Sequence, residues 1–134
     1  MKIKNKDTIK KILFITLSNV GDIVLTTPVL SVLRNEFPAA SIDALSGPLG
    51  KQIFSGHPCV NEHVIYDKFS TLRLKRGLIR ELRKKRYDLI VDLRNSLFPF
   101  LIGSRYRTAV MRSNKLSVCY KRDEHLAKLR SLGL

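Results

Sequence analysis

The stretch that most constrains the fold is residues 12–22, ILFITLSNVGD, in which an apolar run meets a short polar turn. The run from Ile12 to Leu17 is apolar except for one threonine, which is typical of a strand covered on both faces in a parallel sheet. Gly21 then permits a tight or left-handed backbone, and the apolar spacing from Ile23 onward is compatible with a helix. This stretch therefore predicts a strand, a turn and a helix in succession.

Asp22 lies at the end of the turn, where the predicted helix begins. Ligands in open α/β sheets bind outside the carboxyl ends of the strands, so the turn is expected to face a cleft. The free amides of a helix N-terminus favour an anion, which would keep Asp22 ionised and able to accept a proton from a substrate hydroxyl. Asp22 is therefore the candidate catalytic residue. The alternative is that Asp22 only caps its helix.

The same turn carries Ser18 and Asn19, which could hydrogen-bond a substrate or only stabilise the turn. Arg94, Asn95 and Ser96 follow a later predicted strand and are expected to face the same cleft, although polar residues at such positions also cap helices. The turn has neither the GxGxxG fingerprint of a dinucleotide site nor the GxxxxGK[ST] of a P-loop. No nucleotide cofactor is therefore predicted at this position.

The rest of the chain alternates strand-like and helix-like segments. A long helix is predicted over Thr71–Arg86, a loop with a short helix over Gly47–Gly56, and a helical turn or an interruption at Pro99 within Leu97–Ile102. Further strands are expected at Ser41–Leu45, His63–Tyr66, Leu89–Leu93 and Tyr106–Met111. This alternation predicts a single-domain α/β fold with a Rossmann-like, mostly parallel sheet and helices on both faces.

Two sequence blocks in order resemble the lipopolysaccharide heptosyltransferases, the ADP-heptose-dependent enzymes of glycosyltransferase family 9. The first block spans Leu17–Leu45 and contains a Ser-x-x-Gly-Asp turn, a Thr-x-Pro helix, a Phe-Pro helix exit and a second strand with Asp. Its matching residues are Ser18, Gly21, Asp22, Thr26, Pro28, Phe37, Pro38 and Asp43. The second block, Arg86–Leu93, is similar to the family's Tyr-Asp-x-apolar-apolar-Asp-Leu strand. Two ordered blocks are far more specific than one motif.

The resemblance implies the acceptor-side half of a larger enzyme. Family members have two Rossmann-like domains of the GT-B type, and the second, C-terminal domain holds most of the sugar nucleotide. The chain resembles the first domain only, and residues 113–134 are expected to begin the connection to the second. One departure is that Arg94 and Asn95 stand where the family commonly has Gln-Gly, which leaves the acceptor's identity open.

The resemblance also implies a mechanism, inverting transfer of heptose from ADP-heptose to the lipopolysaccharide inner core. By motif position, Asp22 would take the proton from the acceptor hydroxyl. No metal or other cofactor is implied, and the chain has no Asp-x-Asp pair. The residues implied or expected to bind the acceptor are Ser18, Asn19, Gly21, Arg94, Asn95 and Ser96.

Positive charge is concentrated in the predicted helix over Thr71–Arg86, in a chain with 25 basic and 11 acidic residues. Leu74, Leu78 and Leu82 are expected to form one apolar stripe along it. The opposite side gathers Arg73, Arg76, Arg80, Arg83 and Lys84. This side could be a solvated surface, or it could contact an anionic membrane or a phosphorylated glycolipid acceptor. Nucleic-acid binding would need aromatic stacking residues or a reading helix, which this stretch lacks.

The remaining chemistry-bearing residues predict no further site. Cys59 and Cys119 are far apart, without CxxC spacing or a nearby histidine at metal-ligand spacing. The histidines, His57, His63 and His125, are also scattered, so packing or surface roles are expected. The basic N-terminal stretch precedes too short an apolar run for a signal peptide, and no run approaches the length needed to span a bilayer. A reduced, cytoplasmic location is expected, with peripheral attachment to the inner face of the cytoplasmic membrane.

Three functional hypotheses follow. The first is an acceptor-binding half of a heptosyltransferase, whether a fragment, a truncated gene product or one part of a split enzyme, that does not transfer sugar alone. The second is a basic binding module for anionic lipid or nucleic acid, without chemistry. The third keeps the family but changes the donor sugar. The first hypothesis also predicts an uncovered interface that promotes self-association.

Overall fold

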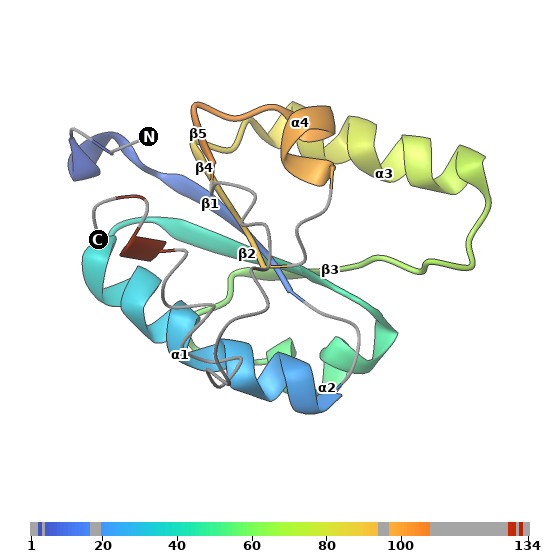
Figure 1. Cartoon of the computed structure of the whole chain (residues 1–134), viewed down its shortest axis with the longest axis horizontal. Helices are drawn as coiled ribbons and strands as arrows, with labels where there is room; N and C mark the ends of the chain where they lie inside the picture. Colours follow the sequence, from blue (N-terminus) through green and yellow to red (C-terminus); the bar gives the residue numbers. More distant parts are fainter. Residues whose placement is uncertain are drawn as a thin grey trace, which may run out of the picture.

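The computed structural model describes residue 3 and residues 5–16, 20–93, 97–107, 129–130 and 132. Within this part of the chain, five strands form one sheet in which every neighbouring pair is parallel (Figure 1). The strands are β1 (Lys11–Ile15), β2 (Ser41–Ser46), β3 (Glu62–Ile65), β4 (Leu89–Asp92) and β5 (Tyr106–Arg107). The helices are α1 (Val20–Glu36), α2 (Lys51–Phe54), α3 (Leu72–Lys85) and α4 (Phe98–Ile102), with 3-10 turns η1 (Lys6–Thr8) and η2 (Pro48–Gly50).

The spatial order of the strands is β3-β2-β1-β4-β5, with β1 at the centre. From β1 the chain runs outward through β2 and β3, and it then returns to the other side of β1 to form β4 and β5. This is the order of a Rossmann-type doubly wound sheet, which reverses direction between β1 and β4.

Helices cover both faces of the sheet. Figure 1 shows α1 and α2 on one face and α3 and α4 on the other. The expected fold class, a Rossmann-like α/β fold with a mostly parallel sheet between two helical layers, is therefore confirmed.

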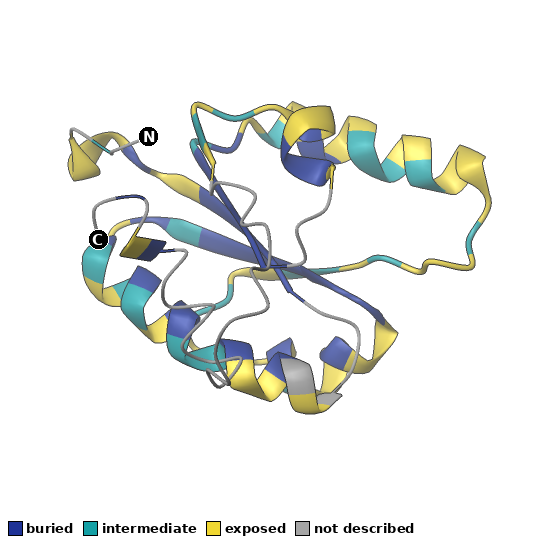
Figure 2. Ribbon diagram, viewed as in Figure 1, coloured by how far each residue is buried: buried dark blue, intermediate teal, exposed yellow. Residues whose placement is uncertain are grey.

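The core consists of two apolar clusters, one on each face of β1 (Figure 2). Ile12 and Phe14 belong to the cluster on the α1 side, and Leu13 and Ile15 belong to the cluster on the α3 side. All four side chains are fully buried. The continuous apolar run of β1 is explained by this burial on both faces, which is worth roughly 1.5–3 kcal/mol for each such side chain.

Helix α1 begins at Val20, three residues before the apolar spacing indicated, and it continues through Pro28. A proline has no N–H, so the carbonyl oxygen of Val24 loses its usual helical partner. The Thr27 hydroxyl donates to that oxygen at 2.7 Å. Thr27, the residue directly before the proline, thus supplies a replacement hydrogen bond, and the helix extends to Glu36.

The ends of α3 match the prediction, and its leucine stripe is buried only toward the end of the helix. The Thr71 hydroxyl caps the helix by accepting from the Leu74 N–H, and Arg86 ends it in a left-handed conformation with φ of 51°. Leu82 is buried and Leu78 is half-buried, whereas Leu74 is 65% exposed. The stripe therefore runs out of the core at the first turn of α3, where Leu72 and Leu74 are both exposed.

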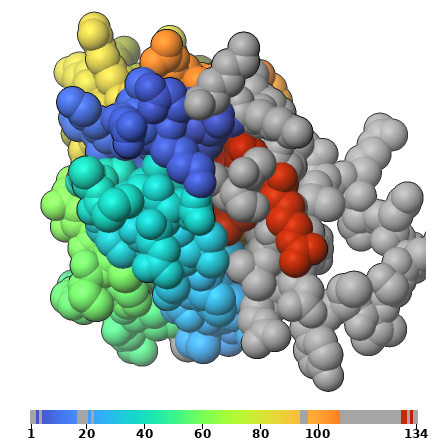
Figure 3. All heavy atoms as spheres, turned by 90° about the vertical axis from the view of Figure 1, so that its left-hand side faces the viewer, coloured from blue at the N-terminus to red at the C-terminus, as the bar shows by residue number. Residues whose placement is uncertain are grey.

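Two residues near the end of the chain pack back onto the α1 side of the core. Leu129 and Leu132 are buried in the same cluster as Ile12, and the Ile3 N–H donates to the Leu132 carbonyl at 3.3 Å. Figure 3 shows their segment, in red, beside the blue N-terminal segment. Residues 108–111 of the expected last strand and the polar stretch 113–123 lie outside the described residues. The connection to a second domain stays a prediction.

Candidate functional site

The carboxyl ends of β1 and β4 lie side by side at the point where the strand order reverses. Ile15, the last residue of β1, pairs in register with Asp92, the last residue of β4. The segments that leave these two strands, residues 16–22 and 93–97, therefore start next to each other. In open α/β sheets this reversal point is where ligands bind, so this edge of the sheet is the candidate site.

Asp22 is the third residue of α1, so its backbone lies in the first helical turn at this edge. An amino-terminal turn carries unpaired N–H groups and the positive end of the helix dipole. Both favour an ionised carboxylate. Of the other candidates, Ser18, Asn19, Arg94, Asn95 and Ser96 lie outside the described residues.

Gly21 has a different backbone conformation from the one considered, although it lies at the expected edge of the sheet. Gly21 is part of α1, and the glycines with positive φ among the described residues are Gly56 and Gly103. The left-handed conformation considered for Gly21 is therefore absent, because the helix starts before it. A Cβ built on Gly21 would meet no atom within 4 Å. The backbone at this point of the helix borders open space, which permits close approach by a ligand.

A pair of buried threonines ties α1 to the end of β1. The hydroxyl oxygens of Thr16 and Thr26 are 2.8 Å apart, and the Thr26 hydroxyl donates to the Ile23 carbonyl at 2.6 Å. Since the Thr26 proton is used in that bond, Thr16 is the donor to Thr26. The pair joins the end of β1 to the second turn of α1, one turn after Asp22. Thr26 was recognised as part of the family pattern, but its partner gave no sequence signal.

A buried carboxylate that the sequence-based site did not include also lies at this edge. Asp92 ends β4 and is 4% exposed. It was read as part of the second block's strand pattern only. Asp92 pairs in register with Ile15, the last residue of β1, so it lies next to the point where the chain leaves β1 toward Asp22.

The cationic residues of α3 are exposed, as expected, but they are spread along the length of the helix. The five residues are Arg73, Arg76, Arg80, Arg83 and Lys84. The ion pairs found within the described ranges involve Lys6 and Lys85 instead. Since α3 connects two parallel strands, it begins at the carboxyl edge and ends at the amino edge of the sheet. Arg73 and Arg76 are therefore toward the candidate site, and Arg83 and Lys84 are away from it.

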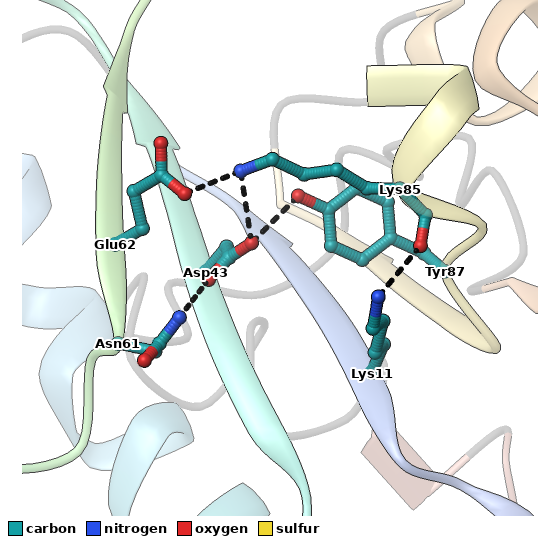
Figure 4. A network of polar contacts seen from close by, with 6 residues as sticks. All are labelled: Lys11, Asp43, Asn61, Glu62, Lys85 and Tyr87. Carbon is teal, nitrogen blue, oxygen red and sulfur yellow. Dashed lines mark hydrogen bonds and ion pairs between the residues drawn. The ribbon is translucent and has the colours of Figure 1, made fainter. Parts of the chain in front are cut away.

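A separate polar network lies at the amino ends of the strands (Figure 4). Asp43 is 6% exposed and accepts hydrogen bonds from Tyr87 at 2.8 Å, Asn61 at 3.1 Å and Lys85 at 3.4 Å. Lys85 also pairs with Glu62. Asp43 is thus part of a structural network, on the opposite edge from the predicted cleft.

The network changes the titration of two of its members. Burial, the hydrogen bond to Asp43 and the nearby negative charges raise the pKa of the Tyr87 phenol above its ordinary value. Burial lowers the pKa of Lys85, but the hydrogen bond to Glu62 and the charge of Asp43 outweigh this effect, so its pKa is raised. Both groups therefore stay protonated at neutral pH.

Asp88 of the second sequence block forms hydrogen bonds to the start of β1. Oδ2 of Asp88 accepts from the N–H groups of Lys10 and Lys11, at 2.9 and 3.0 Å. Tyr87 and Asp88 therefore have structural partners at the amino edge, whereas Asp92 of the same block is at the carboxyl edge.

Histidine and cysteine form no metal site in the part of the chain that the structure describes, where no group of three His, Cys, Asp or Glu residues is placed to hold an ion. His63 contacts the Ser46 hydroxyl at 2.7 Å, and burial lowers its pKa. Cys119 and His125 lie outside the described residues. In the described part of the chain, no helix is long and apolar enough to cross a membrane.

Comparisons with known proteins point in the same direction as this geometry. The chain is 33% identical over 105 residues to lipopolysaccharide heptosyltransferase 2 of Escherichia coli K12, covering 73% of this chain and 30% of that protein. It is 37% identical over 78 residues to lipopolysaccharide heptosyltransferase 3 of the same strain, covering 54% and 23%. No family model matches the chain.

Solved structures agree with the curated relatives. A glycosyl transferase family 9 structure from Veillonella parvula superposes with a TM-score of 0.80 at 22% identity, over 99% of this chain and 44% of that one. The E. coli ADP-heptose heptosyltransferase II structure gives 0.62 at 33% identity, over 73% and 30%. The chain belongs to the lipopolysaccharide heptosyltransferase family. It spans less than half the length of the proteins named here.

Proposed function

We propose that this chain is the acceptor-side half of an inverting heptosyltransferase, which moves heptose from ADP-heptose to the lipopolysaccharide inner core. The observation that carries the proposal is the location of Asp22 in the first turn of α1, at the reversal point of a heptosyltransferase-family Rossmann sheet. The nucleotide sugar would be held by a second, C-terminal domain, and the chain alone would not turn over.

In the proposed reaction, the Asp22 carboxylate accepts the proton of an acceptor sugar hydroxyl. The freed oxygen forms a bond to the anomeric carbon of the donor, while the bond from that carbon to the diphosphate breaks and ADP leaves. Attack from the side opposite the leaving group inverts the anomeric centre. The helix N-terminus favours a negative charge, so the ionised carboxylate is taken as the resting form.

The acceptor would be positioned by residues on both segments of the carboxyl edge. We assign this role to Ser18, Asn19, Gly21, Arg94, Asn95 and Ser96. Gly21 is supported by the open space beside its backbone. The exposed cations at the start of α3, Arg73 and Arg76, would attract the acidic groups of the acceptor, and Arg80, Arg83 and Lys84 would extend the same field. These cations would suit a cytoplasmic protein that works on the inner face of the membrane.

A second candidate function is favoured by the exposed cations of α3, which form no ion pair among the described residues. In that case the chain would be a basic binding module without chemistry. A third candidate is a family 9 transferase for a different sugar, because donor choice would belong to the second domain.

The test is transfer of labelled heptose from ADP-heptose to a truncated core lipopolysaccharide. The chain is assayed alone and together with a separately expressed C-terminal half from the family. Transfer is expected in the mixture only, and Asp22→Asn should reduce it by at least about a hundredfold. Asp7→Asn, an exposed acid in η1 at the amino edge, is the matched control and should leave transfer unchanged.

Two other results would contradict the proposal. Full activity of Asp22→Asn in the mixture would remove Asp22 from the mechanism. Absence of transfer in every mixture, with both halves folded and bound to each other, would favour the binding module. Transfer from a different nucleotide sugar, abolished by Asp22→Asn, would keep the mechanism and replace the donor.

A further inference from the structure

Among the residues that the structure describes, the most exposed apolar side chains lie at the start of α3, in the loop before it, and at α4. Phe69 is 86% exposed, Leu72 74% and Leu97 71%. Leu74, Phe100 and Leu101 are also exposed. Single exposed leucines need no explanation, but a large exposed apolar patch marks an interaction surface. We call Phe69, Leu72, Leu97 and Leu101 the apolar rim, because the three leucines line one groove and Phe69 stands in the loop just before Leu72.

The apolar rim borders a groove of about 380 Å³ between α3 and α4. The floor of the groove includes Ile79 and the edge-to-face pair of Tyr66 and Phe98, whose ring centroids are 4.9 Å apart. Leu72 and Leu101 form parts of its walls. The groove is therefore an open, mainly hydrocarbon surface that is continuous with the rim.

The loop that carries Phe69 is held in place by hydrogen bonds rather than by burial. Oδ1 of Asp67 accepts from the Phe69 N–H at 2.9 Å, and the Ser70 hydroxyl donates to the Asp67 carbonyl at 2.6 Å. Nζ of Lys75 donates to the Lys68 carbonyl at 2.8 Å. The phenylalanine is thus presented to solvent by an ordered loop, which lowers the entropy cost of inserting it into a partner.

Positive charge surrounds this apolar surface. Lys75 and Arg76 line the groove itself, and Arg73 and Arg80 are exposed on the same helix. Nζ of Lys68 lies 5.0 Å from the Phe69 ring centroid, and the Arg107 guanidinium lies 4.3 Å from the Phe100 ring centroid. The acids of α3 and its preceding loop are Asp67 and Glu81, and Asp67 is engaged with backbone.

Apolar side chains ringed by lysine and arginine match the two layers of an anionic bilayer surface. The aromatic and leucine side chains enter the boundary between head groups and acyl chains, while the cations meet the phosphates. A second copy of the same face is a poor occupant, because a two-fold interface would bring the α3 cations of both copies together. Charge complementarity therefore selects an anionic lipid surface.

We propose that the α3–α4 face docks on an anionic phospholipid bilayer by inserting the apolar rim, with Phe69 at its tip and the groove taking up acyl-chain segments. This inference deepens the proposed function, since it names the partner of the cationic face. Tyr66 follows β3 and Leu97 follows β4, so the docked surface adjoins the carboxyl edge where the acceptor is proposed to bind. A lipid-anchored acceptor could then reach that edge without leaving the membrane.

The test uses the absence of tryptophan from the chain, because a single introduced tryptophan reports on its own position only. Phe69→Trp is mixed with vesicles of phosphatidylcholine alone or with phosphatidylglycerol. Binding to the anionic vesicles should shift its emission to shorter wavelength, and lipids brominated on the acyl chains should quench it. Leu49→Trp, at an exposed position on η2 beside the other face, is the matched control and should show neither effect.

Two further variants separate insertion from charge attraction, both measured by vesicle co-sedimentation. Phe69→Ser with Leu72→Ser should weaken binding by at least about tenfold, because inserted apolar surface is lost. Arg73→Ala with Arg76→Ala should weaken it by about thirtyfold, at roughly fivefold for each cation. Circular dichroism melts check that each variant is folded.

Three results would overturn the inference. The first is vesicle binding without a tryptophan shift and without an effect of the serine variant, which would indicate charge attraction alone. The second is equal binding to neutral and anionic vesicles. The third is a concentration-dependent dimer lost in the serine variant, with no vesicle binding, which would make a second copy the occupant. Because no donor or acceptor sugar is present, the vesicle result does not depend on whether transfer occurs.

Discussion

The Tyr87 hydroxyl donates a 2.8 Å hydrogen bond to Oδ2 of Asp43, and this bond joins the two sequence blocks that carry the family resemblance. The two residues are 44 positions apart, and both are nearly fully buried. Their pairing fixes the end of α3 against β2 at the amino edge of the sheet. Asp43 of the first block thus stabilises the fold, whereas Asp22 of the same block lies at the opposite edge of the sheet.

Removing the phenol oxygen should destabilise the protein without affecting the carboxyl edge directly. Tyr87→Phe leaves the buried Asp43 carboxylate with one donor fewer, which is expected to lower the free energy of unfolding by about 1–3 kcal/mol. Urea unfolding followed by circular dichroism measures the change. In a double-mutant cycle with Asp43→Asn, the double variant should lose less unfolding free energy than the sum of the losses of the two single variants. Strict additivity would contradict a direct coupling.

Stability should fall at alkaline pH because of the same network. The pKa of Tyr87 is raised in the folded state above its ordinary value of 10.0, and that of Lys85 is raised above 10.5. The unfolded chain therefore loses these protons first, so the contribution is fully present below pH 10 and is lost as the pH rises further. Urea unfolding at a series of pH values from 8 to about 11 tests this. Tyr87→Phe should flatten the alkaline decline, and an unchanged slope would assign it to other groups.

Gly50 is required for close packing beside β2. A Cβ at this position would lie 1.9 Å from the Ser46 hydroxyl oxygen, so Gly50→Ala should displace Ser46 and break its 2.7 Å contact with His63. A loss of about 1–3 kcal/mol in unfolding free energy is expected. Gly77→Ala is the control, since Gly77 lies in α3 with open space around it and should stabilise the helix by about 0.5–1 kcal/mol. The same sign for both variants would rule out the steric explanation.

The sequence predicted the elements well where a local pattern decides them. β1 is recognisable because burial on both faces requires a continuous apolar run, and α3 because leucines and cations separate onto two sides at helical spacing. The exposure of Leu74 could not be predicted, since helical periodicity says which residues share a face but not whether another element packs there. The apolar rim was missed for the same reason.

The candidate site was predictable to the level of an edge of the sheet. A glycine–aspartate turn after a buried strand identifies the carboxyl edge through topology alone. The structural role of Asp43 was not predictable, because its partners Tyr87 and Lys85 come from a segment far along the chain. The Thr16–Thr26 contact is equally invisible, since a threonine in a strand is ordinary until its neighbour in space is known.

The threonine pair offers the sharpest test of how the fold supports the candidate site. Thr26→Val keeps the shape of the side chain but removes the acceptor for the Thr16 hydroxyl, which is buried. The expected loss is about 1–3 kcal/mol in unfolding free energy. With the start of α1 no longer held to β1 through Thr26, transfer in the mixture with the C-terminal half should also fall by about tenfold or more at temperatures where the variant is fully folded. Thr8→Val removes an exposed hydroxyl in η1 and should change stability by less than about 0.5 kcal/mol, with transfer unaffected. A Thr26→Val protein that is destabilised but transfers normally would separate the threonine pair from the site, and would leave the position of Asp22 to be set by α1 alone.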